Sequence, residues 1–336
     1  MVRGALATMM KRKLSLGLLT ALCIATVAFA QDFPNRTITL VSPYSAGGDA
    51  DLAARNFAAA AQKVLGQSVI VVDKTGASGV VGSAYVIGSA PDGYTLLLAR
   101  TGSQAILPAI QPVKTRYTWD QYTFLSTLEL NPYGCMVNAD SKFRTFNDLV
   151  TEIKTKGKSL NYGTAGVMTT NDMGPRLLFK LLNVTNQAPT EIPYRGTGEA
   201  AQSLLAGQTN FSCGALGPFL GFVRGGKLRV LVVTTRERLS YFPDVPTARE
   251  LGYADMEGIV GWSAVYGPPG LPANVRDKLV ATIRAVAKDP AWIEGTGHTG
   301  SVPHILSPEE TRNFAQKQYE LYKTLGESMG IIDTKP

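Results

Sequence analysis

Histidine and cysteine are scarce in this sequence of 336 residues, which holds two His and three Cys. Cys23 lies within the first thirty residues, and His298 and His304 lie near the C-terminus. A structural zinc site or a Cys–His nucleophilic pair therefore has almost no residues to draw on. We expect a protein that is not an enzyme and that needs neither a metal nor a cofactor.

Long apolar runs are missing after the first thirty residues, so no later segment is expected to cross a membrane. The first thirty residues have a basic start at Lys11-Arg12-Lys13, an apolar run over 14–27 and the small-residue site Ala28-Phe29-Ala30. This order is typical of a secretory signal peptide. We predict a signal peptide over residues 1–30, cleavage after Ala30 and a soluble product in the periplasm.

A large excess of positive charge is also missing once that leader is set aside. The chain has 33 Lys and Arg against 26 Asp and Glu, and four of the basic residues but none of the acids lie in the leader, which leaves a formal charge of +3. No nucleic-acid partner is expected from this balance. The apolar content of 45% is enough for a large core, and the length suggests two domains.

Two cysteines remain beyond the leader, Cys135 and Cys213, which are 78 positions apart. An oxidising compartment permits them to pair. Each lies in an apolar stretch that resembles a strand, however, and we expect two buried thiols.

Short β-rich runs alternate with helix-like segments from Thr37 onward, which predicts an α/β fold with mostly parallel sheets covered on both faces. Small-residue loops between a strand and a helix start recur at 42–51, 74–80, 100–104, 163–171 and 195–199. Such loops gather at the carboxyl ends of parallel strands, where free N–H groups and helix dipoles favour an anion. We therefore predict that main-chain amides hold a carboxylate in one crevice.

Charged residues at these loops have two interpretations each. Arg100 ends the third predicted strand, where its guanidinium could bind a carboxylate through two hydrogen bonds or form a surface salt bridge. Asp49 and Asp51 begin a predicted helix, where an acid is more often a cap than a ligand contact.

Several segments in fixed order carry a family resemblance. They are Phe33-Pro34-Asn35-Arg36, Ala46-Gly47-Gly48, Gly76-Ala77-Ser78-Gly79, Pro91-Asp92-Gly93-Tyr94, Asn161-Tyr162-Gly163-Thr164-Ala165-Gly166, Pro193-Tyr194-Arg195-Gly196 and Phe242-Pro243-Asp244-Val245-Pro246-Thr247. With these segments the chain resembles the solute receptors of the Bug family, which serve tripartite tricarboxylate transporters. The resemblance covers essentially the whole chain after the leader.

The resemblance implies a two-lobed periplasmic binding protein, a type II Venus flytrap with mainly parallel sheets in both lobes. Lobe 1 is expected over residues 31–130 plus 263–336 and lobe 2 over 131–262. Such a receptor, expected here as a monomer, closes on a small carboxylate and delivers it to the membrane components of the transporter. Family members typically hold one carboxylate through backbone groups and ordered water at the first two loops.

Departures from the family pattern narrow the range of ligands that we expect. Asp49 stands where the family usually has a small residue such as Ser, and Arg100 stands where a small residue is common; together they suggest a second carboxylate at a distance from the first. Cys213 and Phe219 suggest a more apolar pocket. The chain is similar here to the terephthalate receptors of the family. Aliphatic di- or tricarboxylates and an aromatic monocarboxylate such as nicotinate are alternative ligands. A ligand-presenting sensor and, more remotely, a periplasmic hydrolase are alternative functions.

The residues predicted to bind the ligand share a place on these loops or on the strands beside them. They are Tyr44, Ser45, Ala46, Gly47, Gly48, Asp51, Ala77, Ser78, Gly79, Arg100, Thr101, Ser103, Gln104, Thr164, Gly166, Met168, Thr169, Thr170, Tyr194, Cys213 and Phe219.

Overall fold

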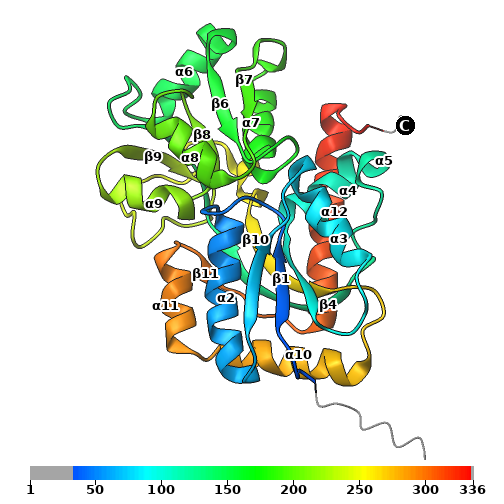
Figure 1. The fold of residues 1–336 in the computed structure, drawn as a ribbon. Helices are drawn as coiled ribbons and strands as arrows, with labels where there is room; N and C mark the ends of the chain where they lie inside the picture. Colours follow the sequence, from blue (N-terminus) through cyan, green and yellow to red (C-terminus); the bar gives the residue numbers. More distant parts are fainter. Residues whose placement is uncertain (1–32, 334–336) are drawn as a thin grey trace, which may run out of the picture. The chain divides into compact units, whose positions relative to one another are not determined.

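The structure is a computed structural model that describes residues 33–333 (Figure 1). The predicted signal peptide lies outside the described residues. A short N-terminal unit ends at Asn35 and contains a cis peptide bond between Phe33 and Pro34. All features below belong to the second unit, which begins at Arg36.

A six-stranded sheet has the strand order β11-β4-β10-β3-β1-β2. Its strands are β1 (Ile38–Ser42), β2 (Val69–Asp73), β3 (Thr95–Arg100), β4 (Thr123–Asn131), β10 (Gly261–Gly267) and β11 (Val302–Pro303). Strand β1 is parallel to β2 and β3, whereas β10 is antiparallel to both β3 and β4. Strand β11 is antiparallel to β4.

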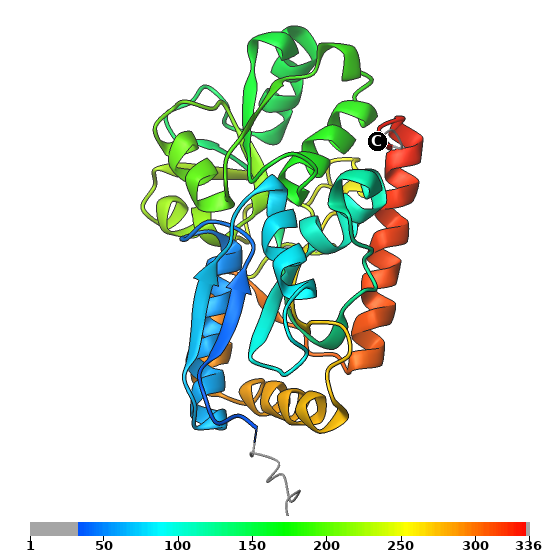
Figure 2. The same cartoon turned by 45° about the vertical axis from the view of Figure 1, so that its right-hand side comes forward.

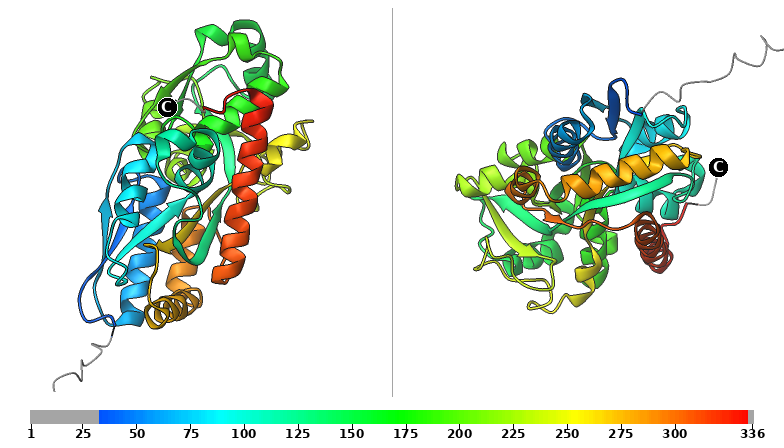
Figure 3. Two further views of the ribbon diagram at one scale, coloured as in Figure 1. Left: turned by 90° about the vertical axis from the view of Figure 1, so that its right-hand side faces the viewer. Right: turned by 90° about the horizontal axis from the view of Figure 1, so that it is seen from below.

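Helices cover both faces of this sheet: successive strand residues, whose side chains point to opposite faces, are buried. Leu96 faces α2 (Asp49–Leu65) and α10 (Ala273–Val286), and the next residue, Leu97, belongs to the core on the other face. Helix α11 (Pro290–His298) packs against α2. The other face carries α3 (Val80–Ile87), α4 (Leu107–Ile110) and α12 (Pro308–Met329), with α5 (Pro112–Thr115) next to α4. Figure 2 shows α4 beside α12, and Figure 3 shows α10 and α12 on opposite sides of β4.

Two smaller sheets are formed by the chain between β4 and β10. One has the order β8-β5-β9 and the other pairs β6 with β7. The strands are β5 (Tyr133–Asn138), β6 (Asn161–Thr164), β7 (Thr190–Pro193), β8 (Ser212–Ala215) and β9 (Leu228–Val233). The helices are α6 (Phe146–Lys156), α7 (Thr170–Leu181), α8 (Thr197–Leu205) and α9 (Gly217–Arg224). Short 3-10 or π segments are η1 (Ala77–Gly79), η2 (Gly102–Ile106), η3 (Gly157–Ser159), η4 (Thr185–Gln187) and η5 (Ala254–Gly258).

The sheets are mixed, which corrects the expectation of mainly parallel sheets. Parallel pairing is found between β1 and β2, β1 and β3, and β6 and β7. Strand β5 is antiparallel to both of its neighbours, and β10 returns between β3 and β4 in the opposite sense. The α/β expectation itself agrees with the structure. Strand–helix alternation predicts parallel pairs locally, but it does not reveal a strand that returns to a sheet from far along the chain.

Cys135 and Cys213 form a disulfide, so the expectation of two free thiols is wrong. The residues are direct partners in the antiparallel pair of β5 and β8, with a Cα–Cα distance of 4.0 Å. Their side chains therefore meet on the same face of the sheet. Sequence separation alone did not reveal this register.

No helix among the described residues has the length and the apolar character that a membrane crossing requires.

Candidate functional site

Three helix starts meet at one cavity. Helices α2, α7 and α8 begin there, and the residues at their N-cap positions, Gly48, Thr169 and Gly196, provide no side-chain cap. The first N–H groups of a helix have no partner within the helix, and the helix dipole adds positive character. The cavity is lined by Tyr44, Asp49, Arg100, Thr101, Gly102, Ala165, Thr169, Thr170, Asn171 and Thr197.

The lining comes from the six-stranded sheet on one side and from the smaller sheets on the other. The enclosed space is about 20 Å³, which is room for about one water molecule. The two sides approach closely next to it: a Cβ on Gly198 would lie 2.7 Å from the Gly47 carbonyl oxygen, and one on Gly196 would lie 2.5 Å from Ser45 Oγ. This space is smaller than an organic acid.

Arg100 lies at the end of β3 and is 5% exposed. Its Nη2 donates to the Asp49 carboxylate and its Nη1 to the Ser263 hydroxyl. Ser263 Oγ in turn donates to Glu129 Oε1 at 3.0 Å, and Asn131 Nδ2 donates to the same oxygen at 2.9 Å. One buried guanidinium thus shares a hydrogen-bond network with two acids.

Asp49 joins the two sides of the cavity. Its Oδ1 accepts a hydrogen bond of 3.0 Å from the Thr197 hydroxyl at the start of α8, while Oδ2 accepts from Arg100. The interpretation of Asp49 as a helix cap is a misassignment, because the N-cap is Gly48 and the carboxylate points to these two partners. Asp51 has the cap-like role: its carboxylate accepts from Gly47 N at 2.9 Å and pairs with Arg55.

Burial raises the pKa of two groups at this site. The carboxyl of Glu129 is 3% exposed, and loss of hydration disfavours its charged form more than the nearby Arg100 favours it. The Tyr44 phenol has its pKa raised by burial as well, and it donates to the Ser78 carbonyl at 2.9 Å. Tyr44 therefore stays neutral and ties the first loop to the second.

A second network lies behind the loop that leads into α7. Asp172 is fully buried and accepts from Tyr162 Oη at 2.9 Å, Arg176 Nε at 2.7 Å and Met168 N at 2.9 Å. Glu191 accepts from Arg176 and from Thr164. These bonds fix both ends of the loop 164–168, which brings Ala165 to the cavity.

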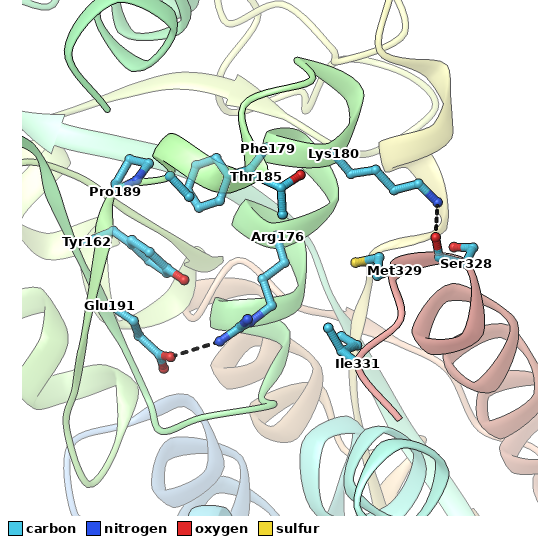
Figure 4. Close-up of a pocket in the computed structure, with 11 residues that line it drawn as sticks. Tyr162, Arg176, Phe179, Lys180, Thr185, Pro189, Glu191, Ser328, Met329 and Ile331 are labelled. Carbon is cyan, nitrogen blue, oxygen red and sulfur yellow. Dashed lines mark hydrogen bonds and ion pairs between the residues drawn. The ribbon is translucent and has the colours of Figure 1, made fainter. Parts of the chain in front are cut away.

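A pocket of about 280 Å³ opens on the far side of this second network (Figure 4). Arg176 and Glu191 project into it as an ion pair, and Lys180 bonds to the Ser328 carbonyl at its edge. Tyr162, Phe179, Met329 and Ile331 are among its apolar walls. The pocket does not share lining residues with the cavity at the helix starts.

Five of the predicted ligand-binding residues line the cavity: Tyr44, Arg100, Thr101, Thr169 and Thr170. Others lie directly beside it. Ser45, Gly47 and Gly48 face the start of α8, Ser78 faces Gly166, and Gly79 contacts Tyr44. Ala46 and Ala77 are exposed on the same loops, and Thr164 and Met168 support the loop before α7.

Other predicted residues are not among those that line the cavity. Ser103 and Gln104 are fully buried, and Gln104 bonds to Ser83 in the core. The Tyr194 hydroxyl bonds to Ser203 on α8. Phe219 packs in a core cluster with Met136 and Leu220, and Cys213 is in the disulfide.

Sequence reasoning did not single out Asp49, Gly102, Ala165 and Thr197 as ligand-binding residues, whereas it did name the helix start that contains Asn171 as one that could close on a ligand. Thr197 and Asn171 stand at predicted helix starts, so their position was a usable signal. Asn171 is 2% exposed, and its Nδ2 has no hydrogen-bond partner among the described residues.

No group of His, Cys, Asp and Glu suited to a metal ion occurs in the part of the chain that the structure describes.

Residues 53–331 match the model of the family described as tripartite tricarboxylate transporter family receptor, TctC. A UPF0065 protein from the TAR-I ttuE-ttuC' intergenic region of Agrobacterium vitis is 34% identical over 287 residues, with 85% of this chain and 82% of that protein covered. The periplasmic binding protein BugD has a TM-score of 0.83 at 26% identity, with 89% and 99% covered. MatC of Rhodopseudomonas palustris, solved with malate, has a TM-score of 0.81 at 28% identity, with 88% and 100% covered.

Proposed function

Because this chain belongs to the tripartite tricarboxylate transporter receptor family, we propose that it captures a small organic carboxylate in the cavity at the starts of α2, α7 and α8. Membership makes the chain a periplasmic solute-binding receptor, and relatives of this fold include a malate-bound protein. We further propose that it delivers the acid to the membrane components of a tripartite tricarboxylate-type transporter. The binding step makes and breaks no covalent bond.

The convergence of three helix starts without N-cap side chains is the observation that carries this proposal. A carboxylate placed there can accept hydrogen bonds from main-chain N–H groups, and the helix dipoles favour its charge. The buried Asn171 Nδ2 adds a side-chain donor at the start of α7.

Binding by closure follows from the small size of the cavity. The proposed lobes, residues 31–130 plus 263–336 and residues 131–262, contribute opposite walls, and the chain passes between the sheets near Pro132 and again before Gly261. Separation of these walls admits the ligand, and their return buries it, in the manner of a hinged receptor.

The identity of the acid is a narrower proposal. The polar lining supports a compact, hydrogen-bonded acid, while Phe219 and Cys213, which had suggested an apolar pocket for terephthalate, lie outside the lining. Terephthalate, aliphatic di- or tricarboxylates and nicotinate all belong in the test panel. A sensor that presents the acid to a signalling protein would use the same cavity. A hydrolase lacks support, because neither His298 nor His304 is among the cavity-lining residues.

Thermal-shift screening and calorimetry of residues 31–336 test the proposal. The panel contains malate, adipate, citrate, benzoate, 4-hydroxybenzoate, terephthalate and nicotinate, each paired with its uncharged amide. We expect at least one acid to raise the melting temperature and to bind with a dissociation constant near 1 μM, about −8 kcal/mol, while its amide does not bind. Binding of no acid, or equal binding of acid and amide, would contradict a carboxylate receptor.

A further inference from the structure

The charge balance at the Arg100 end of the cavity restricts the ligand beyond the carboxylate class. The guanidinium is buried, and its positive charge already has the Asp49 carboxylate as an ion-pair partner. Glu129 lies in the same network through Ser263. The only cation among the residues lining this described cavity is therefore neutralised before a ligand arrives.

A second ligand carboxylate at this end would face an unfavourable environment. It would have to share Arg100 with Asp49 or displace Asp49, and in either case two carboxylates would crowd one buried cation. Like charges at close range repel strongly where water is excluded. Displacement would also break the hydrogen bond from Thr197 that links Asp49 to the other side of the cavity.

A ligand hydroxyl group in the same place has no charge, so Asp49 does not repel it. Asp49 already accepts a hydrogen bond from one hydroxyl, that of Thr197, and Arg100 is a donor next to it. A ligand hydroxyl can donate to Asp49 and accept from Arg100 at the same time.

The start of α7, which also lines the cavity, suits the single carboxylate. Thr170 and Asn171 begin α7, a helix of 12 residues, and Asn171 Nδ2 is buried there without a partner among the described residues. This donor is separate from the Arg100 network. The start of α7 and the Arg100–Asp49 pair therefore differ in what they accept.

We propose that Asp49 determines specificity by selecting monocarboxylates that carry a hydroxyl group as a second hydrogen-bond donor over dicarboxylates. This inference rests on the proposed carboxylate-receptor function. It assigns the carboxylate to the start of α7 and the donor to Asp49. It also reverses the expectation from sequence that Arg100 attracts a second carboxylate.

Calorimetry with matched pairs of acids tests this assignment. The pairs are 4-hydroxybenzoate with terephthalate and 6-hydroxyhexanoate with adipate, and the proteins are the wild-type chain and Asp49→Asn. For the pair whose skeleton fits, we expect the wild type to bind the hydroxy acid at least about tenfold more tightly. Asp49→Asn frees Arg100 and should reverse that order. Asp277→Asn, which makes the same change at an exposed position that does not line the cavity, should leave the order unchanged.

The outcomes separate this inference from the proposed function. A wild type that binds the dicarboxylate equally well or better, or an Asp49→Asn variant that keeps the wild-type order, overturns the role of Asp49 while the receptor function stands. Failure of every acid in the wider panel overturns the receptor function itself. If Asp49→Asn does not fold, as judged by circular dichroism, the order measured for the wild type still decides the ligand class.

Discussion

Glu129 is the residue through which the buried network should respond to pH. Burial raises the pKa of its carboxyl above the ordinary value of 4.5, so the folded chain holds this proton more tightly than the unfolded chain does. The stabilisation is complete below pH 4.5 and is lost as the pH rises through the raised pKa. The carboxyl therefore lowers the free energy of unfolding at neutral pH relative to acid pH.

Glu129→Gln should remove this pH dependence, because glutamine keeps the acceptor for Ser263 and Asn131 but does not ionise. We expect the free energy of unfolding of the wild type to fall relative to that of the variant between pH 4.5 and pH 8. Urea unfolding of both proteins across this range measures the difference. Glu237→Gln, at an exposed position, is the control that should track the wild type. Parallel curves for wild type and Glu129→Gln would contradict the prediction.

Individual site residues could be predicted from sequence where a local rule applies. Arg100 ends a strand, and it does line the cavity. Asp49 begins a helix, and the same local logic misassigned it as a cap, because its partners Arg100 and Thr197 lie 51 and 148 positions away in the chain. Phe219 was placed by family comparison, and its burial in a core cluster could not be read from one sequence.

Two elements, the loop before α2 and the start of α8, control how closely the cavity walls approach. A methyl group on Gly198 would lie 2.7 Å from the carbonyl oxygen of Gly47 and 3.1 Å from Gly48 N, and these are backbone atoms that cannot rotate away. Gly198 lies within α8, where alanine is otherwise favourable. The substitution therefore acts on closure more than on folding.

Gly198→Ala should weaken ligand binding by about 1–3 kcal/mol, or about 5- to 150-fold in dissociation constant, as overpacking does elsewhere. The free energy of unfolding without ligand should not fall. Gly221→Ala in α9, where a Cβ would meet nothing within 4 Å, is the matched control and should bind like the wild type. Calorimetry with the best acid from the panel measures both. Unchanged affinity in Gly198→Ala would show that these walls need not close on the ligand.

At the scale of elements, helices were the more predictable part of the fold. The strand–loop–helix units that begin at β1 and β2 have the local signals that sequence reasoning uses, and the structure places them as expected. Strand β10 joins β3 and β4 at least 130 positions after either strand's end, so its antiparallel sense depended on contacts that no local pattern encodes.

The whole molecule combines a six-stranded sheet with two smaller sheets, and the cavity draws its walls from both regions. Sequence reasoning predicted an anion site at loops from both halves of the chain, because small-residue loops recur before helix starts. It could not predict how far the walls close or which charges they bring together. Those features depend on the fit between two surfaces that are distant in sequence.

A crystal structure of residues 31–336 with the tightest-binding acid of the panel tests the central claim most directly. The account predicts that a ligand carboxylate lies within hydrogen-bond distance of main-chain N–H groups at the starts of α7 and α8, with Asn171 as a further donor. A carboxylate bound elsewhere, for example against Arg176 in the pocket of Figure 4, with no contact to these helix starts, would contradict it.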